Sequence, residues 1–249
     1  EQVYCSESKL KTFVKAFTNV EHIPTFSYMA GFKALIQCAS QAPIPSSLFG
    51  LIHLRCDTEV HEPHNWYLPY DIQVTFNKYE KSDKGIHYYI TTDFYQMGKK
   101  TLSNHNVMLD KAKSYSPRER ECTNKAEINS LSETLSSWPL GLKTTWSYAR
   151  ISGDYNPIHL NAFLAKKLGV KSVIAHGMYN AHASLVQLAK LKDEPLRTVS
   201  IEFNKPCFVP TQVFLKQYNE TESYGLFSAN KKDRYMKITI NTPLDDIYQ

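Results

Sequence analysis

Residues 148–159 read YARISGDYNPIH, a stretch that holds two turn signals close together. Gly153 permits a tight turn, and the Asn-Pro pair at 156–157 favours another because proline fixes the backbone that follows. Asp154 and His159 therefore flank a stiff turn, and their spacing can aim a carboxylate and an imidazole at one point. Such a pair can hold a water molecule and move its proton. The alternative is that these polar side chains only satisfy the turn and a backbone carbonyl.

Two helices are expected after this turn. Asn161 can cap a short helix over residues 162–168, which Gly169 ends in a left-handed conformation. A longer helix is expected within residues 172–191, where apolar residues recur at helical spacing. These are Met178, Ala181, Leu185 and Leu188.

His176 and Gly177 open the long helix. The first N–H groups of a helix have no partners inside it, and the helix dipole favours negative charge there. Gly177 would let a ligand approach the backbone closely. The sequence thus predicts an acid–base pair together with a ready oxyanion hole.

The rest of the sequence predicts that the same order of elements, one helix followed by four strands, occurs in each half of the chain. Strand-like runs follow the long helix at residues 197–208, 212–219, 224–229 and 234–241, which is an α+β pattern. In the first half, a helix is expected over residues 28–40, and strands over 48–60, 68–79, 86–95 and 101–109. A repeat of this length suggests an old duplication; the alternative is two unrelated α+β layers. The polar segment 111–134 predicts an exposed connection, with a boundary near residue 125.

The motif at 148–159, with Ala165 and IAHGM at 174–178, resembles the signature of the MaoC-like (R)-specific enoyl-CoA hydratases. The resemblance implies an α+β tandem (double) hot-dog fold, in which each half wraps an antiparallel sheet around a long central helix. Residues 126–249 would form the catalytic module. Residues 1–125 lack the motif and would form a degenerate N-terminal module that accommodates the acyl chain.

The resemblance also implies roles for individual residues. Asp154 and His159 would be the catalytic pair, Asn156 would help to hold the water, and the Gly177 N–H would bind the thioester carbonyl. His176 and Met178 would lie at the substrate. Ser184 is a nearby candidate whose register is uncertain, so it stays outside the catalytic set. On the first helix Tyr28, Met29 and Phe32 are candidate walls of an acyl tunnel, although such residues are more often plain core.

The implied reaction is hydration of a trans-2-enoyl thioester to the (R)-3-hydroxyacyl thioester, or the reverse dehydration. A dehydratase acting on acyl carrier protein in fatty-acid or polyketide synthesis is an alternative. A non-catalytic acyl-thioester binding module and a hot-dog thioesterase are others. The thioester is itself the substrate, so no separate cofactor is expected.

Composition limits the partners. The net charge of +5 and the pI near 8.8 suit an anionic partner, such as acyl-CoA or an acidic carrier protein. Lysines and arginines are scattered, so no nucleic acid is expected. No apolar run reaches the length of a membrane span, and no signal peptide is visible. The five spaced cysteines suit a reduced, cytoplasmic protein. Two modules in one chain are compatible with a monomer or a homodimer.

Other patterns carry less chemistry. His53, Cys56, His61 and His64 are close in sequence, but on a strand His53 and Cys56 would point to opposite faces, so no metal site is expected. No G-x-S-x-G, P-loop or G-x-G-x-x-G occurs, which argues against nucleophilic hydrolysis, NTP and dinucleotide chemistry.

Overall fold

The computed structural model describes residues 2–3, 7–17, 23–41, 50–111, 130–192, 195–219 and 221–244. The first half holds β1 (Gln2–Val3), α1 (Glu7–Phe17), α2 (Phe26–Gln41), β2 (Ile52–Val60), β3 (Tyr70–Ser82), β4 (Gly85–Gln96) and β5 (Lys99–Lys111). The second half holds β6 (Leu131–Leu140), α4 (Leu142–Ser152), η3 (Pro157–His159), α5 (Ala162–Lys167), α6 (Gly177–Lys192), β7 (Thr198–Phe203), β8 (Thr211–Tyr218), β9 (Ser223–Ser228) and β10 (Arg234–Ile240).

The described strands form one antiparallel sheet in the order β1-β3-β4-β5-β2-β7-β10-β9-β8-β6. The order within the first half is repeated in mirror image by the second, so β2 and β7 meet at the centre. Cys56 and Ile201 are partners across this central pair, and both are fully buried. Arg55 on β2 donates hydrogen bonds to Asp57 and to Ser200 of β7, which ties the halves together. The predicted double hot dog is confirmed in its architecture.

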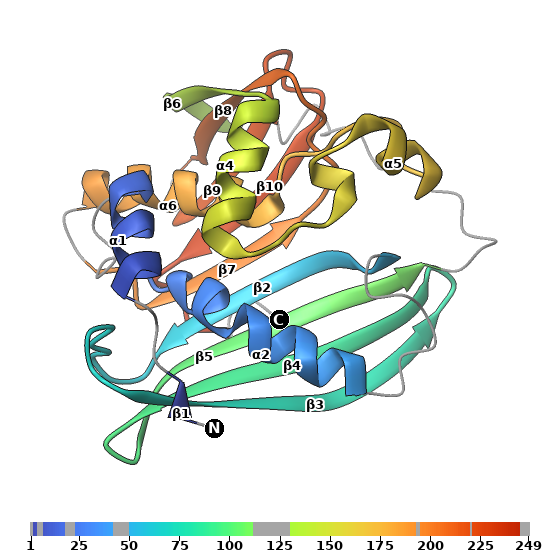
Figure 1. Cartoon of the computed structure of the whole chain (residues 1–249). Coiled ribbons are helices and arrows are strands. Elements are labelled where there is room, and N and C mark those ends of the chain that lie inside the picture. The colour runs from blue at the N-terminus through green and yellow to red at the C-terminus, as the bar shows by residue number, and fades with distance from the viewer. Residues whose placement is uncertain are drawn as a thin grey trace.

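One long helix lies against each half of the sheet (Figure 1). On α6 the four apolar residues at helical spacing are all buried, as predicted. On α2, Met29 and Leu35 are buried, but Ile36 is more than a third exposed and is not a core residue. Figure 1 also shows α1 beside α6 and α4 of the other half. Phe13 and Phe17 of α1 contact the ring of His182 on α6, with centroid distances of 5.1 and 5.4 Å.

Several predicted boundaries were wrong. The long helix begins at Gly177, where the sequence predicts its opening, and residues 172–176 of the stretch 172–191 form a non-helical connection whose Ile174 pairs with Phe208. The run 197–208 stops being a strand after Phe203. Residues 131–134 belong to β6 and not to a linker. The predicted boundary near residue 125 lies outside the described residues.

Candidate active site

The motif turn follows directly from helix α4. Gly153 takes a left-handed conformation (φ 81°) and ends α4, as its lack of a side chain allows. The backbone N–H of Asp154 then donates to Ser152 Oγ at 3.1 Å, and the N–H of Asn156 donates to the Asp154 carboxylate at 3.1 Å. The Asn156 side chain caps η3 by accepting from the N–H of Ile158. These local bonds hold the Asp154 carboxylate and carry the chain to His159 at the end of η3.

His159 has a defined tautomer. Its Nδ1 lies 2.8 Å from the carbonyl oxygen of Ile174. A carbonyl oxygen only accepts, so Nδ1 carries the proton and Nε2 keeps a lone pair. Burial lowers the pKa of His159, although the nearby Asp154 charge acts in the opposite direction. His159 is therefore a neutral imidazole with a free proton acceptor.

His176 supports both members of the predicted pair. Its Nε2 donates to the backbone oxygen of Asp154 at 3.0 Å, and its ring stacks on that of His159 at 3.9 Å with an interplanar angle of 27°. Burial lowers the pKa of His176 well below its ordinary value, and the neighbouring His159 lowers it further. Nδ1 of His176 is buried and has no hydrogen-bond partner among the described residues. The sequence predicts that His176 lies at the substrate. The structure shows in addition that His176 contacts both Asp154 and His159.

Asp154, His159 and His176 each offer a ligand atom, and these atoms lie within 4.8 Å of one another. A metal ion could in principle be held there. Each imidazole already uses one nitrogen on a backbone carbonyl, Nδ1 of His159 on Ile174 and Nε2 of His176 on Asp154, so each ring has one nitrogen left for a ligand. The three histidines at 53, 61 and 64 each form a hydrogen bond with a different side chain. His53 bonds to Asn106, His61 to Ser103 and His64 to Thr101.

The N-terminus of α6 lies at the same cavity as the pair. Gly177 is the first residue of α6, so its N–H has no partner within the helix. A Cβ atom at Gly177 would lie 2.8 Å from the ring of Phe203, so a larger residue would collide with that ring. Ser184 is fully buried, and its hydroxyl donates to the carbonyl of Asn180 on its own helix.

A cavity of about 1190 Å³ connects these features. All nine residues predicted for the site line it: Asp154, Asn156, His159, His176, Gly177, Met178, Tyr28, Met29 and Phe32. Sequence reasoning missed other lining residues, notably His53 and Phe203, which lie on β2 and β7. The His53 ring stacks on Tyr28 and contacts Phe203, and burial lowers the pKa of His53 to about 4. Their contacts join segments far apart in the chain, so no local pattern marks them.

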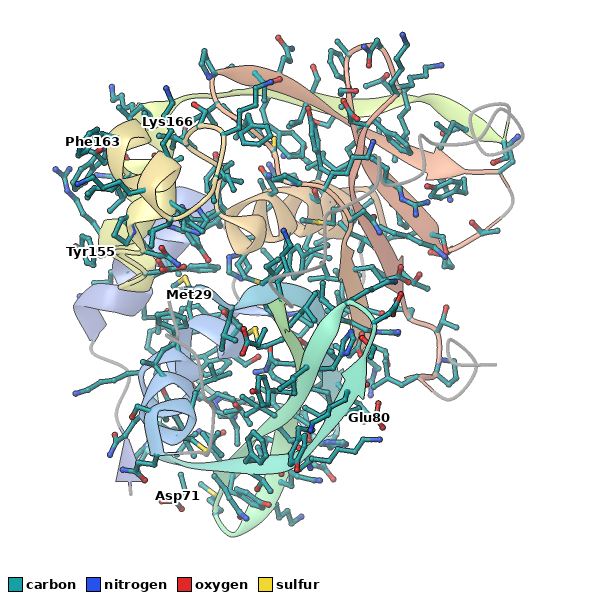
Figure 2. The ribbon with its side chains drawn as sticks, turned by 90° about the vertical axis from the view of Figure 1, so that its right-hand side faces the viewer. Met29, Asp71, Glu80, Tyr155, Phe163 and Lys166 are labelled. Atoms are coloured by element: carbon teal, nitrogen blue, oxygen red, sulfur yellow. The ribbon has the colours of Figure 1, made fainter. Side chains whose placement is uncertain are left out.

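The cavity continues along α2 into the first half. Beyond Phe32 it is lined by Leu35, Ile36 and Ala39 of α2, and by Ile90 and Met108 of the sheet opposite. This end is apolar, whereas the end at α6 holds the imidazoles and the carboxylate. Met29 is fully buried, and Figure 2 shows it in the interior between the two halves.

Within the described residues, no helix combines the length and the apolar character that crossing a membrane requires.

The fold and the site together define a double hot-dog protein with a carboxylate–imidazole pair at a deep cavity. Residues 123–224 match the model of the family described as MaoC like domain. The second half of the chain therefore carries a MaoC-like domain, as the motif at 148–159 predicts.

One curated protein and two solved structures are similar to this chain. Over 92 residues the chain is 35% identical to 3-hydroxyacyl-thioester dehydratase X of Mycobacterium tuberculosis (strain ATCC 25618 / H37Rv). That match covers 37% of this chain and about a third (32%) of the relative. The crystal structure of HtdX from Mycobacterium tuberculosis superposes with a TM-score of 0.80, covering 96% of this chain and 97% of that one at 18% identity. A second protein from that organism, described as having a double hotdog fold, gives a TM-score of 0.53 at 8% identity and covers 96% and 92%.

Proposed function

We propose that this protein catalyses the reversible hydration of trans-2-enoyl thioesters to (R)-3-hydroxyacyl thioesters. One observation carries the proposal: the neutral Nε2 of His159 and the carboxylate of Asp154 line one cavity with the N-terminus of α6. The name of the mycobacterial relative, a 3-hydroxyacyl-thioester dehydratase, supports the same class of reaction.

In the hydration direction, Asp154 and His159 hold a water molecule at Cβ of the enoyl group. A water proton moves to the pair as the oxygen–Cβ bond forms, and the pair then returns a proton to Cα. The net change is addition of water across the double bond, and no oxidant or reductant is needed. Negative charge develops on the thioester oxygen between these steps. The N–H of Gly177 at the start of α6 stabilises it there.

His176 is a positioning residue in this mechanism. Its hydrogen bond fixes the backbone of Asp154, and its ring fixes the plane of the His159 imidazole. Because His176 is buried and neutral, it adds no positive charge that would oppose protonation of His159 during turnover.

The apolar arm of the cavity favours a medium- or long-chain acyl group over a four-carbon one. It is lined from Tyr28 to Ala39, a stretch of α2 about 16 Å long at the usual helical rise. An acyl chain that starts at the pair can extend along this helix, so the first half provides the chain-binding wall of the site.

The test is the loss of enoyl absorbance with trans-2-enoyl-CoA substrates of increasing chain length, followed by chiral analysis of the product. We expect an (R)-3-hydroxyacyl product and higher kcat/KM for longer chains. Release of free thiol, detected with a thiol reagent, would instead identify a thioesterase. If neither CoA nor carrier-protein thioesters react, the proposed reaction is wrong.

A further inference from the structure

The short helix α5 lies where the cavity meets the surface. Chain segments on both sides of α5 line the cavity: Tyr155 before the helix, and Leu168 and Lys171 after it. These three residues are also exposed to solvent. Figure 2 shows Tyr155, Phe163 and Lys166 on the same side of the molecule. The helix therefore borders one opening of the cavity, which we call its mouth.

Helix α5 leaves apolar side chains uncovered. Only Ala165 of its six residues is buried. Phe163 is 64% exposed, and Leu164 and Leu168 are exposed as well. Apolar residues gathered at a mouth are typical of a binding surface rather than of a plain solvated helix. We call Phe163, Leu164, Lys166, Lys167, Leu168 and Lys171 the α5 collar.

The collar is positively charged, and the sequence around it offers few acidic residues to balance its lysines. Residues 134–192 contain seven lysines and arginines, but Asp154 is their only acidic residue and it lines the cavity. Across the described part of the chain, Lys166 and Lys171 form no ion pair. Lys167 lies over the Phe163 ring at 4.6 Å. A partner with acidic and apolar groups on one face would complement this surface.

We propose that the α5 collar docks an acidic carrier protein that presents the acyl group on a phosphopantetheine arm. This inference rests on the proposed function and names its substrate form. Coenzyme A could place phosphates near Lys171 and its adenine on the Phe163 ring, but one nucleotide is too small to cover Phe163, Leu164 and Leu168 together. A carrier helix bearing acidic and apolar side chains covers both, while its arm passes the mouth and brings the thioester to Asp154 and His159.

The test compares one acyl chain attached to an acidic acyl carrier protein and to CoA. In the variant Lys166→Glu/Lys167→Glu, kcat/KM for the carrier substrate should fall about tenfold or more at low ionic strength, because both charges then repel the partner. The loss with the CoA thioester, whose phosphates pass the same collar, should be several-fold smaller. The matched control is Lys81→Glu/Lys84→Glu, which makes the same change of charge at two exposed lysines of the β3–β4 hairpin. It should leave both substrates unaffected.

An equal loss with both substrates, or no loss with the carrier, would overturn the docking proposal. So would turnover of the CoA thioester with no turnover of the carrier thioester. If neither reacts, the proposed reaction fails, and calorimetric titration with holo-carrier protein decides the docking separately. Binding that the Lys166→Glu/Lys167→Glu variant weakens supports docking, and absence of binding refutes it. The docking proposal would also be refuted if light scattering showed a dimer for the wild type and a monomer for Phe163→Ser. That result would mean that the collar binds a second copy of this chain.

Discussion

The two halves share a strand order but differ in the connection between their helices. In the second half, residues 153–176 join α4 to α6, and this segment holds the motif turn, η3 and α5. The corresponding connection in the first half, from α1 to α2, consists of residues 18–25. This shorter segment does not contain the D-x-N-P-x-H pattern of residues 154–159. The second half therefore has the only copy of the motif in the duplicated sequence, on the longer of the two connections.

The two halves also differ in the first residue of their long helices, α6 and α2. Helix α6 begins at Gly177, against which the Phe203 ring packs. Helix α2 begins at Phe26, which is fully buried against Phe13 and Trp66. One helix start thus borders a cavity and the other is filled by an aromatic side chain. A half without the reactive end can therefore still line the apolar part of the shared cavity.

The largest effect is expected from removing the pair that only the second half has. Asp154→Asn and His159→Ala should each lower kcat/KM by about 10²- to 10⁴-fold, because each removes an acid–base group. Circular dichroism and thermal unfolding should show a retained fold. His87→Ala changes a histidine of the first half that does not line the cavity and serves as the control. Wild-type turnover in either site variant would contradict the mechanism.

The turn that carries this pair was readable in the sequence, because its residues determine their own local geometry. Gly153 and Asn156 make the bonds and dihedral angles that their chemistry predicts. Helix α4 was missed for a physical reason. Its buried positions have helical spacing, but they include Thr145 and Ser152, so no apolar stripe is visible. Strand β6 was missed because it pairs only with β8 at the sheet edge and has little apolar alternation.

A smaller effect is expected from filling the helix start that the second half keeps open. Gly177→Ala places a Cβ atom 2.8 Å from the Phe203 ring, so either the ring or the first turn of α6 must move. Overpacking of this kind costs about 1–3 kcal/mol of stability, and a displaced N–H should lower kcat about tenfold or more. Gly177→Ala/Phe203→Leu should recover part of both losses. Failure of this double variant to recover either would show that the ring is not the cause.

The contribution of the first half can be separated by chain length. Ala39→Phe adds a ring in the apolar arm of the cavity, far along α2 from the pair. We expect kcat/KM to fall about tenfold for a long acyl chain and to stay unchanged for crotonyl-CoA, because an apolar pocket discriminates by a few kcal/mol at most. Gln37→Phe, on an exposed position of the same helix, is the matched control. Equal losses for long and short chains would mean that the acyl group lies elsewhere.

The smallest effect concerns the joint between the halves, which is the part that sequence periodicity could not reveal. His182 on α6 is fully buried, donates through Nε2 to the carbonyl of Thr25 in the first half, and accepts at Nδ1 from the Tyr148 hydroxyl at 3.3 Å. Burial lowers its pKa from 6.5 to about 4. Between these two pH values the unfolded chain binds the proton and the folded chain does not. The contribution of His182 to the free energy of unfolding is therefore fully present above pH 6.5 and is lost as the pH falls toward 4.

His182→Gln keeps a side chain that can donate to the Thr25 carbonyl but removes the titrating group. Urea unfolding of both proteins at several pH values between 4 and 7 should give a shallower pH dependence for the variant, whatever its stability at pH 7. An identical slope in the two proteins would mean that other groups control acid unfolding. A shallower slope would show that the contact between α6 and the first half depends on a neutral His182, and so that the two halves are held together by a buried hydrogen bond as well as by the shared sheet.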